Sequence, residues 1–113
     1  MKLSYAIKFV SDMDKAVAFH RDVLGLPLKF ESPFWSEFAT GDTTLALHPA
    51  RPDKPAGAVE LGFQTGDLER LYAERDRYGL TFTKAPEPQH GTLLARFLDS
   101  EGRECSISGG STG

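Results

Sequence analysis

The sequence has a single cysteine, Cys105, so no disulfide can form within the chain. This is typical of a reducing compartment, and we expect a cytoplasmic location. The first residues do not combine a long apolar stretch with a cleavage site, so we expect no signal peptide. Apolar runs stay well below the roughly 20 residues that span a bilayer, so we expect no membrane association.

The chain also lacks the charge pattern of a nucleic-acid-binding protein. Its formal net charge is −3 over 113 residues, and lysine and arginine form no basic cluster. There is no phosphate-binding glycine loop, no Cys-x-x-Cys pair and no Ser/His/Asp spacing. The acidic balance favours a neutral or cationic ligand over a polyanion.

What the sequence does have is an internal repeat with a period of about 55 residues. Each copy reads as a strand, a capped helix that ends at a glycine, and three short strands. The helices follow the N-caps Ser11 and Asp67 and stop at Gly25 and Gly79. We expect one α+β domain over residues 1–113: module 1 (1–49), a connector (50–57), module 2 (58–109) and a disordered tail (110–113). Two tandem βαβββ modules predict a curved mixed sheet around a cleft, with the helices on the outer face.

The first hairpin fixes the faces of the first module. Gly41-Asp42 has the signature of a two-residue type II′ turn. This register pairs Phe38 with Leu45 and Glu37 with Ala46. Opposed residues share a face, so Phe38, Leu45 and Leu47 should pack on the helix. The other face, which we expect to line the cleft, carries Trp35, Glu37, Ala46 and His48.

The second module is harder to interpret because its closing turn is longer. Pairing Leu98 with Arg103 places Phe97 and Ser106 on the cleft face and Cys105 on the helix side. Alternation along residues 58–64 places Glu60 on the cleft face. The segment 84–91, KAPEPQHG, contains two prolines and reads as a loop. In the first strand, Tyr5, Ile7 and Phe9 share one face, and alternation alone leaves open whether that face lines the cleft.

Three stretches resemble the vicinal oxygen chelate superfamily, which includes glyoxalases, bleomycin-resistance proteins, fosfomycin-resistance proteins and extradiol dioxygenases. They are IKFVSDMDKAVAFHRDVLGL, ELGFQTGDLERLYAERDRYGL and the ending FLDSEGRECSIS. The resemblance covers nearly the whole chain, to about residue 108. It implies paired βαβββ modules and clefts formed in a homodimer.

In the metalloenzymes of that superfamily, the resemblance places four metal ligands at the positions of Tyr5, Ala46, Glu60 and Ser106. Of these, only Glu60 is a good ligand for a divalent metal, and alanine offers no lone pair. The resemblance therefore predicts a site without the usual metal. A displaced metal site made by Glu37, His48 and Glu60 stays open as an alternative.

Two functions follow from these residues. The first is a metal-free protein that binds a small aromatic or cationic molecule. Its expected ligand-binding residues are Tyr5, Trp35, Glu37, His48, Glu60, Phe97 and Ser106. The second is a lyase or isomerase of the glyoxalase type, with a relocated metal or with Glu60 and His48 as an acid–base pair.

Overall fold

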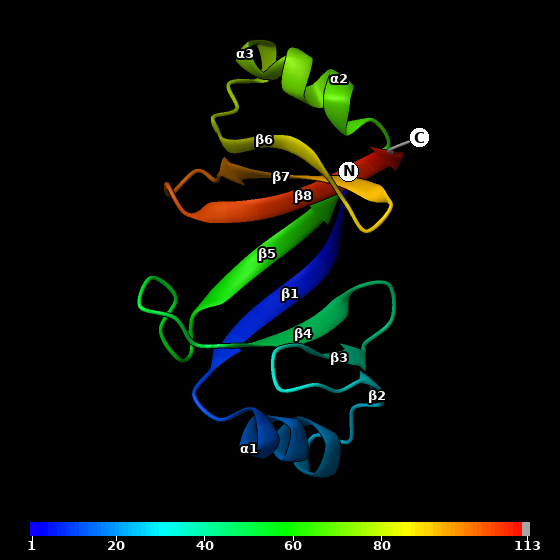
Figure 1. The fold of residues 1–113 in the computed structure, drawn as a ribbon, viewed down its shortest axis with the longest axis vertical. Coiled ribbons are helices and arrows are strands. Elements are labelled where there is room, and N and C mark those ends of the chain that lie inside the picture. Colours follow the sequence, from blue (N-terminus) through cyan, green and yellow to red (C-terminus); the bar gives the residue numbers. More distant parts are fainter. Residues whose placement is uncertain (112–113) are drawn as a thin grey trace. The chain divides into compact units, whose positions relative to one another are not determined.

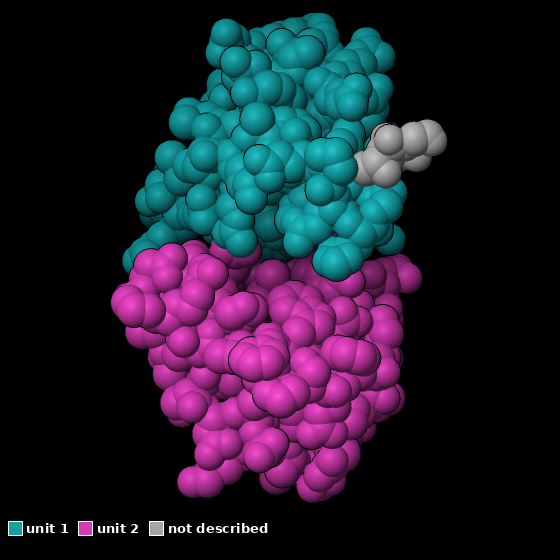
Figure 2. Space-filling view, viewed as in Figure 1, with its two compact units in different colours: residues 1–3, 61–113 teal, residues 4–60 magenta. Residues whose placement is uncertain are grey.

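The computed structural model describes residues 1–111, and its elements place the chain in the α+β class (Figure 1). In chain order they are β1 (Lys2–Val10), α1 (Met13–Ala18), the π-helix η1 (Phe19–Val23), β2 (Leu28–Phe30), β3 (Ser36–Ala39), β4 (Thr44–Pro49), β5 (Val59–Gln64), α2 (Leu68–Ala73), α3 (Arg75–Tyr78), β6 (Phe82–Gln89), β7 (Thr92–Leu98) and β8 (Glu104–Ser111). Contacts divide the chain into two compact units (Figure 2). Unit 2 comprises residues 4–60, and unit 1 comprises residues 1–3 and those from 61 onward.

Unit 2 is a mixed sheet with a helix packed on one face. Its strand order is β2-β3-β4-β1, in which β1 and β4 run parallel and the other pairs run antiparallel. The predicted register of the first hairpin is confirmed, because Glu37 pairs with Ala46 and Phe38 with Leu45. The core on the helix side joins Val10, Val17, Phe38 and Leu47, all buried. The six-residue α1 is too short to be stable alone, so this packing holds it in place.

The helix of unit 2 begins one residue later than expected. Asp12 is the N-cap, and its carboxylate accepts a hydrogen bond from the Lys15 backbone N–H at 3.1 Å. The predicted cap, Ser11, lies just outside the helix. The helix continues as η1, where His20 is buried and its Nδ1 lies 2.7 Å from the carbonyl oxygen of Ala16.

Unit 1 repeats the order strand, helix and three strands. Its sheet order is β5-β8-β7-β6, with β5 and β8 parallel. The predicted cap Asp67 is confirmed, since its carboxylate accepts a hydrogen bond from the Arg70 N–H at 3.1 Å. The predicted stop Gly79 adopts φ 69°, a left-handed conformation that ends a helix well. The core joins Leu68 to residues of β7 and β8, including Ala95 and Ile107.

The segment predicted as a loop, 84–91, is largely strand. β6 runs through Gln89 and pairs with β7, with Pro88 opposite Leu93. The prolines are tolerated because β6 is the edge strand of this sheet, where a missing N–H need not break a ladder. His90 and Gly91, with φ of 52° and 83°, form the two-residue turn of the hairpin.

The predicted register of the second hairpin is wrong by one residue. Leu98 pairs with Glu104, not with Arg103, and Phe97 pairs with Cys105. The cause is the turn: the Asp99 carboxylate accepts hydrogen bonds from the N–H groups of Glu101 and Arg103, and Arg103 stays outside the ladder. Relative to the prediction, this slip turns the side chains of β7 to the opposite face, whereas those of β8 keep their predicted face.

Strand β8 extends to Ser111, so residues 110 and 111 are not the disordered tail that the sequence predicted. Residues 112 and 113 of that predicted tail lie outside the described residues. Among residues 1–111, no helix combines the length and apolar character required to cross a membrane.

A close backbone approach near the end of β8 gives a test of the fold of unit 1. A Cβ at Gly109 would lie 2.0 Å from the carbonyl oxygen of Thr65, whose N–H donates to the Ser108 carbonyl. Gly109→Ala should therefore lower the free energy of unfolding by about 1–3 kcal/mol, as measured by urea denaturation. Gly66→Ala is the matched control, because a Cβ there meets no atom within 4 Å. Equal stability of the two variants would contradict the close approach.

Candidate functional site

The predicted ligand-binding residues of unit 2 lie on the face of its sheet that is opposite α1, and we call this face the open face of unit 2. The parallel ladder places Ile7 beside Ala46 and Phe9 beside His48. This settles the alternative that the sequence left open for the first strand: Tyr5, Ile7 and Phe9 share the face of Ala46 and His48. Ile7, Phe9 and Ala46 form a buried floor, and Tyr5 and Trp35 pack against it.

Trp35 is held in place by the loop that precedes β3. The Ser32 hydroxyl accepts a hydrogen bond from the Trp35 N–H at 3.0 Å and donates to the Trp35 carbonyl at 2.8 Å. The Ser36 hydroxyl, fully buried, donates to the Ser32 carbonyl at 3.3 Å. Serine hydroxyls often close local turns by hydrogen-bonding to nearby backbone groups in this way. The indole is therefore positioned by the backbone as well as by its packing.

Three aromatic side chains surround the floor. The rings of Tyr5 and Trp35 have centroids 6.0 Å apart, and those of Trp35 and His48 are 6.3 Å apart in an edge-to-face arrangement. Phe9 contacts His48 at 5.2 Å. These spacings fall within the range of favourable aromatic pairs. All three of Tyr5, Trp35 and His48 are half-buried, so each retains exposed ring surface.

Glu37 contacts two of these aromatic side chains. Its carboxylate accepts a hydrogen bond from the Trp35 indole N–H at 2.7 Å and another from the Tyr5 hydroxyl. The ammonium of Lys29 lies 3.8 Å from the other carboxylate oxygen. Partial burial raises the pKa of Tyr5 above its usual value, and the charge of Glu37 and the hydrogen bond to it raise it further. Tyr5 is therefore a neutral hydrogen-bond donor over the physiological range.

His48 is fixed in one tautomer. Its Nδ1 lies 2.7 Å from the carbonyl oxygen of Pro49, which can only accept, so Nδ1 carries the proton. In the neutral ring Nε2 is then the acceptor. Arg51 places its guanidinium over the Phe9 ring, 5.6 Å from the centroid, and pairs with Asp53 at 3.4 Å.

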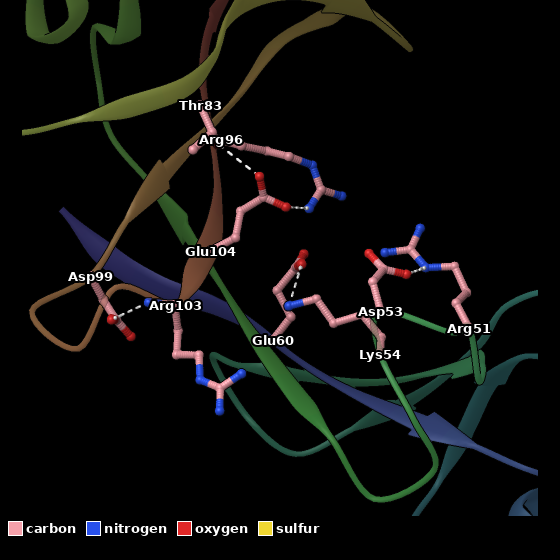
Figure 3. Close-up of polar contacts among 9 residues, drawn as sticks. All are labelled: Arg51, Asp53, Lys54, Glu60, Thr83, Arg96, Asp99, Arg103 and Glu104. Carbon is pink, nitrogen blue, oxygen red and sulfur yellow. Dashed lines mark hydrogen bonds and ion pairs between the residues drawn. The ribbon is translucent and has the colours of Figure 1, made fainter.

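Glu60 lies farther along the same face and is almost fully buried. Its side chain is 2% exposed, and the Lys54 ammonium lies 3.6 Å from one carboxylate oxygen (Figure 3). Lys54 is itself largely buried, with 14% of its side chain exposed. The sequence predicted Glu60 as a ligand-binding residue, and the structure gives it a cationic partner within the chain.

The two predicted residues of unit 1 lie on opposite faces of its sheet. Ser106 pairs with Arg96 and with Gly62, on the face away from the helices. Phe97 instead packs on the helix side with Ala95 and Ile107, so the prediction that it lines the ligand face is wrong. This follows from the slipped register. Arg96 lies on the same face as Ser106 and pairs with Glu104 at 2.8 Å (Figure 3).

The residues at the superfamily's metal positions do not fit a metal ion. Ala46 is fully buried and has no donor atom, and Tyr5 directs its hydroxyl to Glu37. Glu60 faces a lysine. The alternative set of Glu37, His48 and Glu60 is not brought together either, since no group of three or more His, Cys, Asp or Glu side chains suited to a metal occurs within residues 1–111.

Two hollows lie elsewhere on the described surface. One, of about 330 Å³, lies on the helix side of unit 2 and is lined by Lys8, Lys15 and Phe19 among others. The other, of about 340 Å³, is in unit 1 beside Met1, Gln64 and Gly66. Neither is lined by Tyr5, Trp35 or His48, although Phe9 of the floor contributes to the first.

Sequence reasoning missed three cations of unit 2: Lys29, Arg51 and Lys54. For Lys29 a signal was present, because it alternates with Leu28, whose side chain joins the helix-side core. For Arg51 and Lys54 there was none, since both lie in an irregular connector whose path depends on long-range contacts. Their effect is that both predicted carboxylates, Glu37 and Glu60, have a nearby positive charge.

The raised pKa of Tyr5 gives a test of this geometry. An alkaline titration of tyrosinate absorbance should show one of the three tyrosines ionising above the usual value of about 10, and Tyr5→Phe should remove that step. Glu37→Gln should lower the pKa of Tyr5 without returning it to normal, because burial remains. Between pH 10 and the raised pKa, only the unfolded chain loses this proton, so the free energy of unfolding should fall as pH rises. A Tyr5→Phe variant that keeps the step above pH 10 would contradict the contact.

Comparisons with known proteins agree with this architecture. The sequence matches the family described as Glyoxalase/Bleomycin resistance protein/Dioxygenase superfamily over residues 2–105. No protein of curated function matches the chain. The solved structures with a similar fold include a hypothetical protein from Bacillus halodurans C-125, with a TM-score of 0.77, 15% identity, and coverage of 99% of this chain and 96% of that one.

Two further structures are similar. Methylmalonyl-CoA epimerase from Mycobacterium tuberculosis has a TM-score of 0.77 at 16% identity, over 97% of this chain and 88% of that one. A glyoxalase/bleomycin resistance protein/dioxygenase superfamily member from Vibrio splendidus 12B01 has a TM-score of 0.71 at 17% identity, over 94% and 97%. At these identities the likeness shows the fold alone. The eight strands, the mixed sheets and the match over residues 2–105 together establish that this chain belongs to the glyoxalase/bleomycin resistance protein/dioxygenase superfamily.

Proposed function

We propose that this chain binds a small molecule with an aromatic ring on the open face of unit 2. The observation that carries the proposal is the group of Tyr5, Trp35 and His48, three half-buried rings around an apolar floor. A core would bury these rings fully, and a solvated sheet face would carry small polar or charged residues instead. Half-buried, fixed aromatic side chains supply contact area to a planar ligand at a low entropic cost.

The charges favour an aromatic ligand over a purely cationic one. Glu37 accepts hydrogen bonds from Tyr5 and Trp35 and lies near Lys29, and Glu60 is paired with Lys54. Neither carboxylate therefore offers an uncompensated negative charge. A cationic ring would still gain from the faces of Trp35 and Tyr5, which attract positive charge. We expect an aromatic cation to bind more tightly than its anionic analogue, but the ring to supply most of the affinity.

The same contacts support binding over catalysis. An acid–base pair of Glu60 and His48 would need both groups to reach a substrate. Glu60 is 2% exposed and faces an ammonium, and the Nδ1 of His48 is committed to a backbone carbonyl. With Nδ1 committed in this way, the other ring nitrogen of His48, Nε2, is the one that can accept a hydrogen bond from a ligand. We therefore assign His48 to ligand contact.

Removing the indole should weaken binding. Three bicyclic probes differ mainly in charge: N-methylquinolinium, 2-naphthol and 2-naphthalenesulfonate. By isothermal titration calorimetry we expect affinity to fall in that order, and Trp35→Leu to weaken the first two by about 2- to 10-fold, the worth of one aromatic contact. Tyr78→Leu is the matched control, since Tyr78 is an exposed aromatic of α3 in unit 1.

Equal losses in the two variants, or no binding of any probe, would overturn the proposal. The same protein should be assayed for bound metal and for turnover with added Ni²⁺, Zn²⁺ or Mn²⁺. Stoichiometric metal with metal-dependent turnover would establish the lyase or isomerase alternative instead. A homodimer and a cytoplasmic location stay predictions beside this one.

A further inference from the structure

We propose that Lys54 takes the place of a metal ion at Glu60, so that the chain itself supplies the cation that this carboxylate requires. The inference begins from the burial of both groups. Glu60 is 2% exposed and Lys54 14% exposed, with the ammonium nitrogen 3.6 Å from the carboxylate oxygen. A carboxylate buried to this extent needs a compensating charge, because desolvation otherwise makes its ionised form very costly.

The connector between β4 and β5 holds Lys54 in a defined turn. Arg51 and Lys54 exchange backbone hydrogen bonds of 2.9 and 3.0 Å, which close a tight turn. Farther on, the Gly57 N–H donates to the Phe9 carbonyl at 2.8 Å, and the Phe9 N–H donates to the Ala58 carbonyl at 2.9 Å. The connector is therefore fixed to β1 at its far end. Lys54 is part of a defined turn and not of a free loop.

The pair lies on the open face of unit 2. Ala58 packs against the floor made by Ile7, Phe9 and Ala46. Ala58 directly precedes β5, in which Glu60 is buried between the exposed Val59 and Leu61, so alternation places Glu60 on the side of Ala58. Figure 3 shows Lys54 and Glu60 pointing toward one another, beside the Arg51–Asp53 pair.

Glu60 occupies one of the four positions at which the superfamily resemblance places metal ligands. Of Tyr5, Ala46, Glu60 and Ser106, only Glu60 is a carboxylate, and one carboxylate cannot hold a divalent ion tightly. A buried carboxylate at this position with no cation beside it would lower the stability of the fold. An ammonium from the connector balances its charge, and it does so without a metal ion.

A double-mutant cycle with thermal unfolding tests this inference. We expect the wild-type Tm to change by no more than about 1 °C with MnCl₂, NiCl₂, ZnCl₂ or EDTA. Lys54→Met should lower the Tm by on the order of 10 °C, because it removes the ammonium that pairs with a buried carboxylate. The double variant Lys54→Met/Glu60→Gln should lose much less than the sum of the two single changes. Lys29→Met is the matched control, since Lys29 is half exposed beside Glu37 and should cost at most a few degrees.

If Lys54→Met does not fold, Glu60→Gln and the double variant still decide the question. Glu60→Gln leaves a buried ammonium without its carboxylate, so we expect the double variant to be the more stable of the two. Additive effects, a Lys54→Met shift no larger than that of Lys29→Met, or a wild-type Tm that rises with stoichiometric metal and falls with EDTA would each overturn the inference. These measurements report only stability and metal binding. The inference about Lys54 can therefore be overturned while the aromatic probes still bind, and aromatic binding can be overturned while this inference holds.

Discussion

The packing of one short helix on one sheet face is the interaction on which the rest of this structure depends. In unit 2, Val17 of α1 is buried against Phe38 and Leu47, and in unit 1 Leu68 of α2 is buried against Ala95 and Ile107. Helices of six residues have little stability of their own, so they depend on packing their apolar faces against the sheet. Because strand side chains alternate, each sheet then has a second face that the helix does not cover.

The open faces of the two units differ in character. In unit 2, Tyr5, Trp35 and His48 surround an apolar floor. In unit 1, the corresponding face carries Ser106 and the Arg96–Glu104 pair. The two units share an aspartate N-cap, a parallel strand pair and the order of their elements, yet their open faces carry different side chains.

Much of this could be predicted from the sequence, and the failures have identifiable physical causes. Gly41-Asp42 fixed the first register because a two-residue turn permits only one pairing, so Glu37 and Ala46 were placed correctly. The longer turn at Asp99 permits several, and the choice made there misplaced Phe97. The strand status of residues 84–89 depends on β6 lying at the sheet edge, which proline content does not reveal. Lys54 could not be found, because the path of an irregular connector depends on contacts distant in sequence.

The hydrogen bond between the Trp35 indole and Glu37 has a practical consequence. This tryptophan is the only one in the chain. Its emission therefore reports from the open face of unit 2 without any label, and the nearby carboxylate at 2.7 Å makes that emission sensitive to the charge and hydration around it. A compound screen on the unmodified protein could follow one wavelength and read occupancy of this face directly.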